Sequence, residues 1–105
     1  MHYTVQARFI PNTATDFLRK LTDGTIENQQ PDGKGIVASM KRAVIDEKSV
    51  VRWSEVCYCP TPRQHERTTV YDDHFTDIET VEVSDYVEFE GKALMDCMEQ
   101  LARNN

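Results

Sequence analysis

The sequence predicts an α+β fold, specifically a ferredoxin-like β-α-β-β-α-β sandwich with an additional C-terminal helix, in a single domain over residues 1–105. Three observations lead to this prediction. Apolar and polar residues alternate over residues 2–10, as they do in a half-buried strand. Residues 50–59 are dense in Val, Trp, Tyr and Cys, which favour strands. Residues 14–21 and 94–101 show the apolar spacing of amphipathic helices.

The first strand and the first helix follow from local patterns. In the strand, Pro11 ends the alternation, and the apolar face carries Tyr3, Val5, Ala7 and Phe9. Asn12 or Thr13 caps the helix that follows. The apolar stripe of this helix consists of Ala14, Phe17, Leu18 and Leu21. We expect the helix to end at Gly24 or to continue to about Asn28.

A β-hairpin is predicted for the middle of the chain. Residues 30–35 form a loop, because Pro, Asp and Gly favour turns. Residues 36–45 fit either a helix or a strand. We prefer the strand, because the polar turn at residues 46–49 leads directly into the strand-like residues 50–59.

The second half of the chain is less regular. Thr61 and Pro62 suit the start of a helix, whereas residues 68–71 favour a strand, so both possibilities stay open for residues 62–75. Apolar residues between acids predict one strand or two short ones over residues 76–89. A final helix is expected over residues 92–103, with a stripe of Leu94, Cys97, Met98 and Leu101.

The charge of the chain is unevenly distributed. Residues 1–54 carry eight Lys/Arg and six Asp/Glu, whereas residues 55–105 carry four and twelve, which gives the net charge of −6. Eight acids and no Lys or Arg lie between residues 71 and 91. Such a surface repels phosphate backbones, so nucleic acid is excluded as a partner. A solvated face is preferred over a docking face for a basic partner.

The sequence also predicts a cytoplasmic protein. Its first residues lack the basic and apolar regions of a signal peptide, and no apolar run approaches the roughly 18 residues of a membrane helix. Three cysteines, an odd number, do not suggest a disulfide framework. We therefore expect reduced thiols and no membrane association.

Cysteine and histidine residues are the first candidates for chemistry. Cys57 and Cys59 share one face of a strand, with His65 and His74 further along. Zinc sites need four ligands, and paired cysteines are usually two to four residues apart. We therefore predict no metal and no cofactor, with the thiols acting as small buried apolar groups. Cys97 is expected in the core.

Acidic residues offer two weaker candidates. Asp72, Asp73 and His74 could suggest an acid–base pair or a metal site, but consecutive residues do not converge on one point. Glu55 lies on the more apolar face of its strand, together with Trp53. A bulge is the preferred explanation, and the alternatives are a buried carboxyl group or one that reaches water at a sheet edge.

The strongest candidate is the sheet face that the helices leave free. In the predicted fold, the first and third strands are central neighbours, and their outward side chains share this face. The proposed ligand-binding residues are Arg8, Arg52, Gln6 and Tyr58. Two guanidinium groups among hydrogen-bonding side chains suit a small anion. The competing interpretation is a solvated face, or salt bridges to Asp77 and Glu79.

The leading functional hypothesis is a small protein that binds a small anionic ligand on this helix-free face, in the cleft of a homodimer. A second hypothesis is an interaction protein that docks through its acidic C-terminal half. A third is a small enzyme that uses the cleft, with Tyr58 or Glu55 as proton carrier, or a Cys/His metal site. No catalytic residue can be assigned from the sequence.

Overall fold

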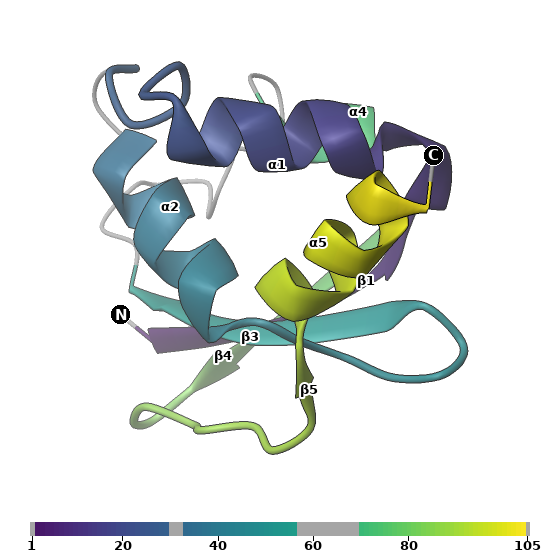
Figure 1. The fold of residues 1–105 in the computed structure, drawn as a ribbon. Helices are drawn as coiled ribbons and strands as arrows, with labels where there is room; N and C mark the ends of the chain where they lie inside the picture. Colours follow the sequence, from purple (N-terminus) through teal and green to yellow (C-terminus); the bar gives the residue numbers. More distant parts are fainter. Residues whose placement is uncertain (1, 30–32, 57–69, 105) are drawn as a thin grey trace.

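The computed structural model describes residues 2–29, 33–56 and 70–104. Within these ranges the chain forms a five-stranded antiparallel sheet with helices on one face, which confirms the α+β class (Figure 1). The order of the strands across the sheet is β4-β1-β3-β2-β5. The strands are β1 (His2–Phe9), β2 (Val44–Ile45), β3 (Val50–Val56), β4 (Phe75–Val83) and β5 (Lys92–Ala93).

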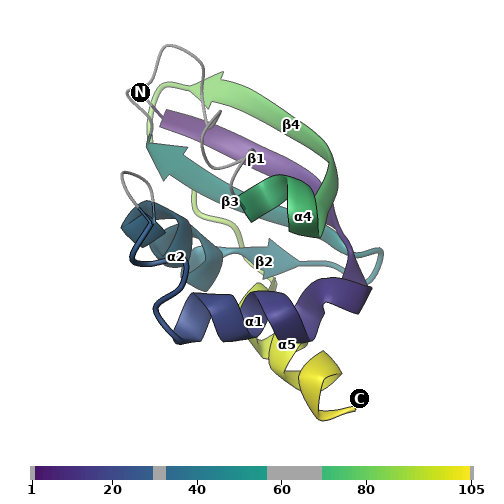
Figure 2. The same cartoon turned by 90° about the horizontal axis from the view of Figure 1, so that it is seen from above.

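Helices cover one side of this sheet. Figure 1 shows α1, α2 and α5 above the strands, and Figure 2 shows the short α4 over the sheet as well. The helical elements are η1 (Pro11–Thr13), α1 (Ala14–Thr22), α2 (Gly33–Arg42), α4 (Asp72–His74) and α5 (Leu94–Arg103). Among the described residues, no helix is long and apolar enough to cross a membrane.

The ferredoxin-like arrangement is not confirmed. A fifth strand extends the sheet beside β2, and β2 itself has only two residues. Two helices, α1 and α2, separate β1 from β2. Between β3 and β4, the described residues 70–74 form one short helical segment, which includes the three-residue helix α4. The order and the length of these elements therefore differ from the predicted sandwich.

The core lies between the helices and the sheet. The predicted alternation of β1 is confirmed, because Val5, Ala7 and Phe9 are buried whereas Gln6 and Arg8 are exposed. From β3, Val51 and Trp53 point to the same side. The helices add the buried side chains of Phe17, Leu21, Ile36, Met40, Leu94 and Met98. Burial of each large apolar side chain contributes about 1.5–3 kcal/mol to the free energy of unfolding.

The helix α2 corrects two predictions of the sequence analysis. Residues 33–35 are the first turn of this helix rather than a loop, and residues 36–42 are helical rather than a strand. Gly33 permits a close approach, because a Cβ there would lie 2.0 Å from the carbonyl oxygen of Ile26. Ile36, Val37 and Met40 are all buried, and this burial of adjacent residues together with the residue one turn later fits a helix rather than an alternating strand.

The hairpin exists, but only from Val44 onwards. β2 and β3 pair across a turn in which Asp46 Oδ1 accepts hydrogen bonds from the backbone N–H groups of Lys48 (2.8 Å) and Val50 (3.0 Å). Ser49 adopts a positive φ of 66°, a conformation that is uncommon outside turns. The predicted turn at residues 46–49 is therefore confirmed, while the predicted start of the strand is eight residues too early.

The remaining predictions have mixed outcomes. The first helix ends at Thr22, just before Gly24 with its positive φ of 91°, and the C-terminal helix begins at Leu94. Residues 76–89 contain one strand, which ends at Val83. The predicted helix start at Thr61 lies outside the described residues, and so does most of the range 62–75.

Candidate functional site

Residues 84–91, called the strap below, cross the sheet on the side opposite the helices. They leave β4 at one edge of the sheet and reach β5 at the other edge (Figure 1). The hydroxyl of Ser54 donates a hydrogen bond to the carbonyl oxygen of Val87, and the Arg42 guanidinium lies 6.0 Å from the centre of the Tyr86 ring. The helix-free face is therefore not bare, and Ser54 is only 4% exposed.

Two cavities lie between the strap and the strands, and Phe89 lines both of them. The first has a volume of about 150 Å³ and is lined by Thr4, Val5, Gln6, Arg52, Glu79, Val81 and Phe89. We call it the Arg52 cavity. The second has a volume of about 140 Å³ and is lined by Arg42, Trp53, Ser54, Tyr86, Val87, Glu88 and Phe89. Each cavity therefore contains one guanidinium group and one carboxyl group.

The polar side of the Arg52 cavity is a row of residues across three neighbouring strands. Gln6 on β1 is the register partner of Arg52 on β3 and of Glu79 on β4. Arg52 Nε donates a hydrogen bond to Gln6 Oε1 at 3.1 Å. Two of the predicted ligand-binding residues, Gln6 and Arg52, are therefore held together in one cavity.

The charge of Arg52 is only partly engaged. Its Nη1 lies 3.5 Å from Asp46 Oδ2, while the other oxygen of Asp46 accepts the backbone hydrogen bonds of the hairpin turn. These backbone bonds, first that of Val50, together with Arg52, lower the pKa of Asp46. Within the described part of the chain, Arg52 Nη2 has no acceptor. An added anion could therefore bind this edge of the guanidinium without displacing Gln6.

Arg8 is not part of this cavity. Its guanidinium lies 3.8 Å from the carboxylate of Asp77 on β4, and both side chains are exposed. Asp77 has a positive φ of 53°, and the pairing of β1 with β4 shifts by one residue between Gln6 and Arg8. This β-bulge separates the pair from the cavity. Tyr58, the fourth predicted residue, lies outside the described residues.

Glu55 is buried beneath the helices and does not line the cavities on the strap side. It is 6% exposed, and its Oε1 accepts hydrogen bonds from Trp53 Nε1 at 2.8 Å and from the Tyr71 hydroxyl at 2.5 Å. The preferred explanation, a bulge at Glu55, is wrong, because the pairing of β3 with β1 is regular through this residue. A proton carrier for the strap-side cleft cannot be assigned to Glu55.

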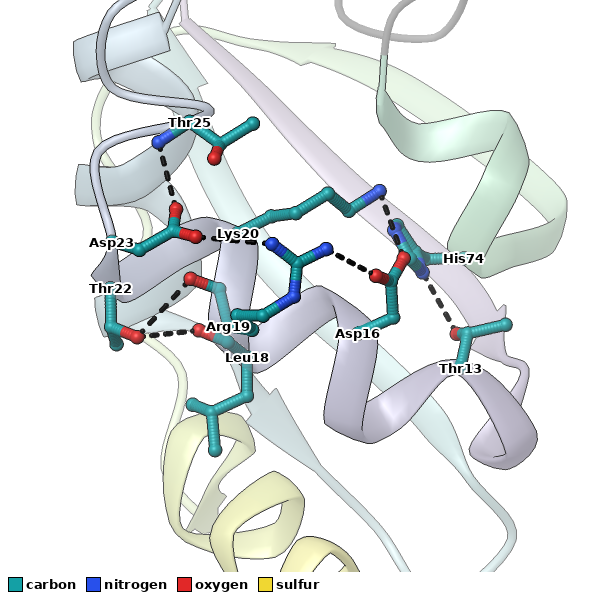
Figure 3. Close-up of polar contacts among 9 residues, drawn as sticks. All are labelled: Thr13, Asp16, Leu18, Arg19, Lys20, Thr22, Asp23, Thr25 and His74. Atoms are coloured by element: carbon teal, nitrogen blue, oxygen red, sulfur yellow. Dashed lines mark hydrogen bonds and ion pairs between the residues drawn. The ribbon is translucent and has the colours of Figure 1, made fainter.

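His74 is a core residue rather than a member of an acidic cluster. It is 1% exposed and stacks on Phe17 with a centroid distance of 4.0 Å. Its Nδ1 lies 2.8 Å from Thr13 Oγ1 (Figure 3). Because the Thr13 hydroxyl donates to the carbonyl oxygen of Ile10, Nδ1 must donate in this contact. Burial, together with the nearby Lys20 ammonium, lowers the pKa of His74 to about 4.

The other candidates from the sequence do not converge where they can be examined. Cys57, Cys59 and His65 lie outside the described residues. Cys97 is half-buried, has a free thiol and packs against the core. Over residues 2–29, 33–56 and 70–104, no group of three metal-ligating side chains is close enough to hold an ion.

Sequence reasoning missed several lining residues, among them Arg42 and Phe89. The strand predicted for residues 36–45 includes Arg42, whereas Arg42 lies at the end of α2, where its Nη2 donates to the carbonyl oxygen of Ser54 at 3.3 Å. The alternation of Val87 and Phe89 with acids predicts that both residues lie in a strand. The early end of β4 turns these residues back across the sheet instead.

Comparison with known proteins finds no match: no family model, no curated protein and no solved structure is significantly similar to this chain.

Proposed function

We propose that this protein binds the anionic group of a small molecule in the Arg52 cavity, between the strap and strands β1, β3 and β4. The observation that carries this proposal is the position of Arg52. The hydrogen bond of 3.1 Å from Arg52 Nε to Gln6 Oε1 fixes the guanidinium. The Arg52 side chain is still 37% exposed, and it lies beside a cavity of about 150 Å³. Such a fixed but accessible guanidinium suits a carboxylate or a phosphate.

Competition from the protein's own acids is weak at this position. A good guanidinium–carboxylate hydrogen bond has a length of about 2.7–2.9 Å, whereas Asp46 lies 3.5 Å from Arg52. A bound anion therefore forms shorter contacts than the existing pair does. Because the ion pair with Asp46 is solvent-exposed, its disturbance costs less than about 1 kcal/mol.

The structure changes the list of ligand-binding residues that we propose. Gln6 and Arg52 remain its centre, and Thr4, Glu79 and Phe89 are added as lining residues. Arg8 is engaged with Asp77 outside the cavity, and Tyr58 stays a prediction.

Three further features stay predictions from the sequence. These are a homodimer, residence in the cytoplasm and a lack of nucleic-acid binding. We also retain the ferredoxin-like sandwich as a proposal, supported by the antiparallel sheet with helices on one face but not by the order of its five strands. Sedimentation at micromolar concentration tests the homodimer, and a monomer would contradict it.

The proposal can be tested by NMR titration of the protein with acetate and with inorganic phosphate. We expect shifts confined to β1, β3, β4 and the strap, and a loss of affinity of about tenfold or more in Arg52→Ala. Arg103→Ala is the matched control, because Arg103 is also paired with one exposed acid, Glu99, but lies on α5. Equal weakening in both variants, or shifts elsewhere, would contradict the proposal.

One observation favours a second function, an interaction through the acidic half of the chain. β4 is an edge strand, and it carries the exposed residues Asp77, Glu79 and Glu82. The strap adds exposed Asp85, Glu88 and Glu90. A basic peptide is the partner that such a surface would attract. Salt-sensitive shifts along β4 upon addition of an oligolysine peptide would support this function, and their absence would exclude it.

A further inference from the structure

We infer that the ligand of the Arg52 cavity is a small zwitterion of the α-amino acid class, whose carboxylate binds Arg52 and whose ammonium binds Glu79. This inference rests on the proposed function and adds the second charge of the ligand. It follows from the row of side chains that crosses the floor of the cavity, from the charge balance there, and from its apolar lining.

Opposite charges stand at the two ends of this row. Glu79 and Arg52 are the register partners of Gln6 on its two sides, so they lie on the first and third of three neighbouring strands. Because neighbouring strands are about 4.8 Å apart, their backbones are separated by about 10 Å. The hydrogen bond from Arg52 to Gln6 draws the guanidinium towards the middle of this span. The remaining gap fits a ligand with two adjacent charged groups.

Glu79 is available for a cation. Its side chain is exposed, and the described residues include no Lys or Arg within ion-pair distance of it. The neighbouring acid Asp77 is paired with Arg8, and Asp46 stabilises the hairpin turn. Glu79 is therefore the carboxylate of this region that a ligand ammonium can engage.

The same carboxylate disfavours a ligand that carries only negative charge. A simple anion at Arg52 would bring a like charge towards the Glu79 carboxylate. This repulsion lowers the affinity of the cavity for simple anions. A zwitterion converts this repulsion into attraction. The charge balance of the cavity therefore discriminates between two ligand classes that Arg52 alone would treat equally.

Apolar surface in the cavity suits a short aliphatic side chain. Val81 and Phe89 line it, and Val81 is 58% exposed. A volume of about 150 Å³ is small beside the roughly 300–1,000 Å³ of pockets for drug-sized ligands, so the cavity suits a ligand of the size of a small amino acid. L-Valine has this size and both charges.

Three probes that share one branched alkyl group separate the contributions of the two charges. L-Valine carries both, isovalerate lacks the ammonium, and isobutylamine lacks the carboxylate. Measured by NMR titration of the wild-type protein, L-valine should bind about tenfold more tightly than either single-charge probe. Equal binding of L-valine and isovalerate would overturn the inference.

Variants assign each charge to its residue. Glu79→Gln should reduce the affinity for L-valine about tenfold while leaving isovalerate unchanged or strengthened, and Arg52→Ala should weaken both probes. Glu82→Gln is the matched control, because Glu82 is exposed on the same strand but is paired with Tyr3, whose side chain faces the core. It should change neither affinity.

The outcomes separate this inference from the proposed function. If isovalerate binds as tightly as L-valine and Arg52→Ala weakens both, the anion site stands and the zwitterion is wrong. If no probe binds at millimolar concentration, or if Arg52→Ala changes nothing, both proposals fail. Unchanged melting temperatures of all three variants would show that the losses do not reflect unfolding.

Discussion

The two faces of the central strands β1 and β3 differ in almost every property, although they share one backbone. On the helix side, Val5 and Trp53 are register partners, and each is 1% exposed. The next pair in the register, Gln6 after Val5 and Arg52 before Trp53, lines an open cavity on the other face. The period of two in a strand thus places the stability of the fold on one face and the candidate site on the other.

This separation means that the site can change with little cost to the fold. A substitution of Gln6 or Arg52 removes solvent-exposed contacts, whereas a substitution on the helix side leaves a cavity in a close-packed core. The comparison can be tested by measuring how substitutions on each face change the free energy of unfolding.

The largest effect is expected for Trp53→Ala. The Trp53 ring packs 5.3 Å from Phe75 and 5.2 Å from Tyr71, and its Nε1 donates to buried Glu55. Loss of the ring should lower the free energy of unfolding by about 3–5 kcal/mol, since a large core side chain is removed. Urea denaturation followed by circular dichroism measures this change. A loss below about 1 kcal/mol would contradict the assignment of the core.

On the same face, acidic pH should lower the free energy of unfolding by a smaller amount, through His74. Burial lowers the pKa of His74 from 6.5 to about 4, an effect that Lys20 strengthens while Asp73 and Asp16 oppose it. Between these two values the unfolded chain binds a proton that the folded chain does not. The free energy of unfolding therefore keeps its full value above pH 6.5 and falls by up to about 3 kcal/mol as the pH decreases to about 4.

His74→Phe provides the comparison for this pH dependence. Phenylalanine keeps the stacking on Phe17 but cannot take up a proton. The difference in unfolding free energy between the wild type and His74→Phe should therefore change with pH between 6.5 and 4. Parallel stability curves would show that His74 does not titrate as its burial implies.

The smallest effect is expected for Arg52→Ala, next to Trp53 in the sequence but on the opposite face. Its contacts with Gln6 and Asp46 are exposed, so the free energy of unfolding should fall by less than about 1 kcal/mol. The same urea titration measures it. A loss of several kcal/mol would remove the distinction between the two faces.

Much of the helix-side face could be predicted from the sequence, because its signals are local. The alternation in β1 and the stripe of α1 depend only on neighbouring residues, and both are confirmed. α2 could not be assigned this way, since the apolar residues around Ile36 fit both periods. Its helical conformation depends on non-local contacts, such as that of Gly33 with the backbone of Ile26.

The strap-side site could be predicted only in part, for a related reason. That Gln6 and Arg52 face the same side follows from strand periodicity. Their meeting with Glu79 requires the register of three strands, which is a property of the folded sheet. The strap itself was missed because Val87 and Phe89 alternate with acids just as a strand does.

The β-bulge at Asp77 has a consequence for how chains meet one another. β4 is an outer strand of nine residues, and within the described residues no other strand pairs with its second edge. Long regular edges can act as templates for further chains and so promote amyloid-like growth. The bulge interrupts this edge at Asp77, and the carboxylates of Glu79 and Glu82 would repel an identical strand placed beside it. The irregularity that keeps Arg8 out of the cavity therefore also protects the sheet against self-templated aggregation.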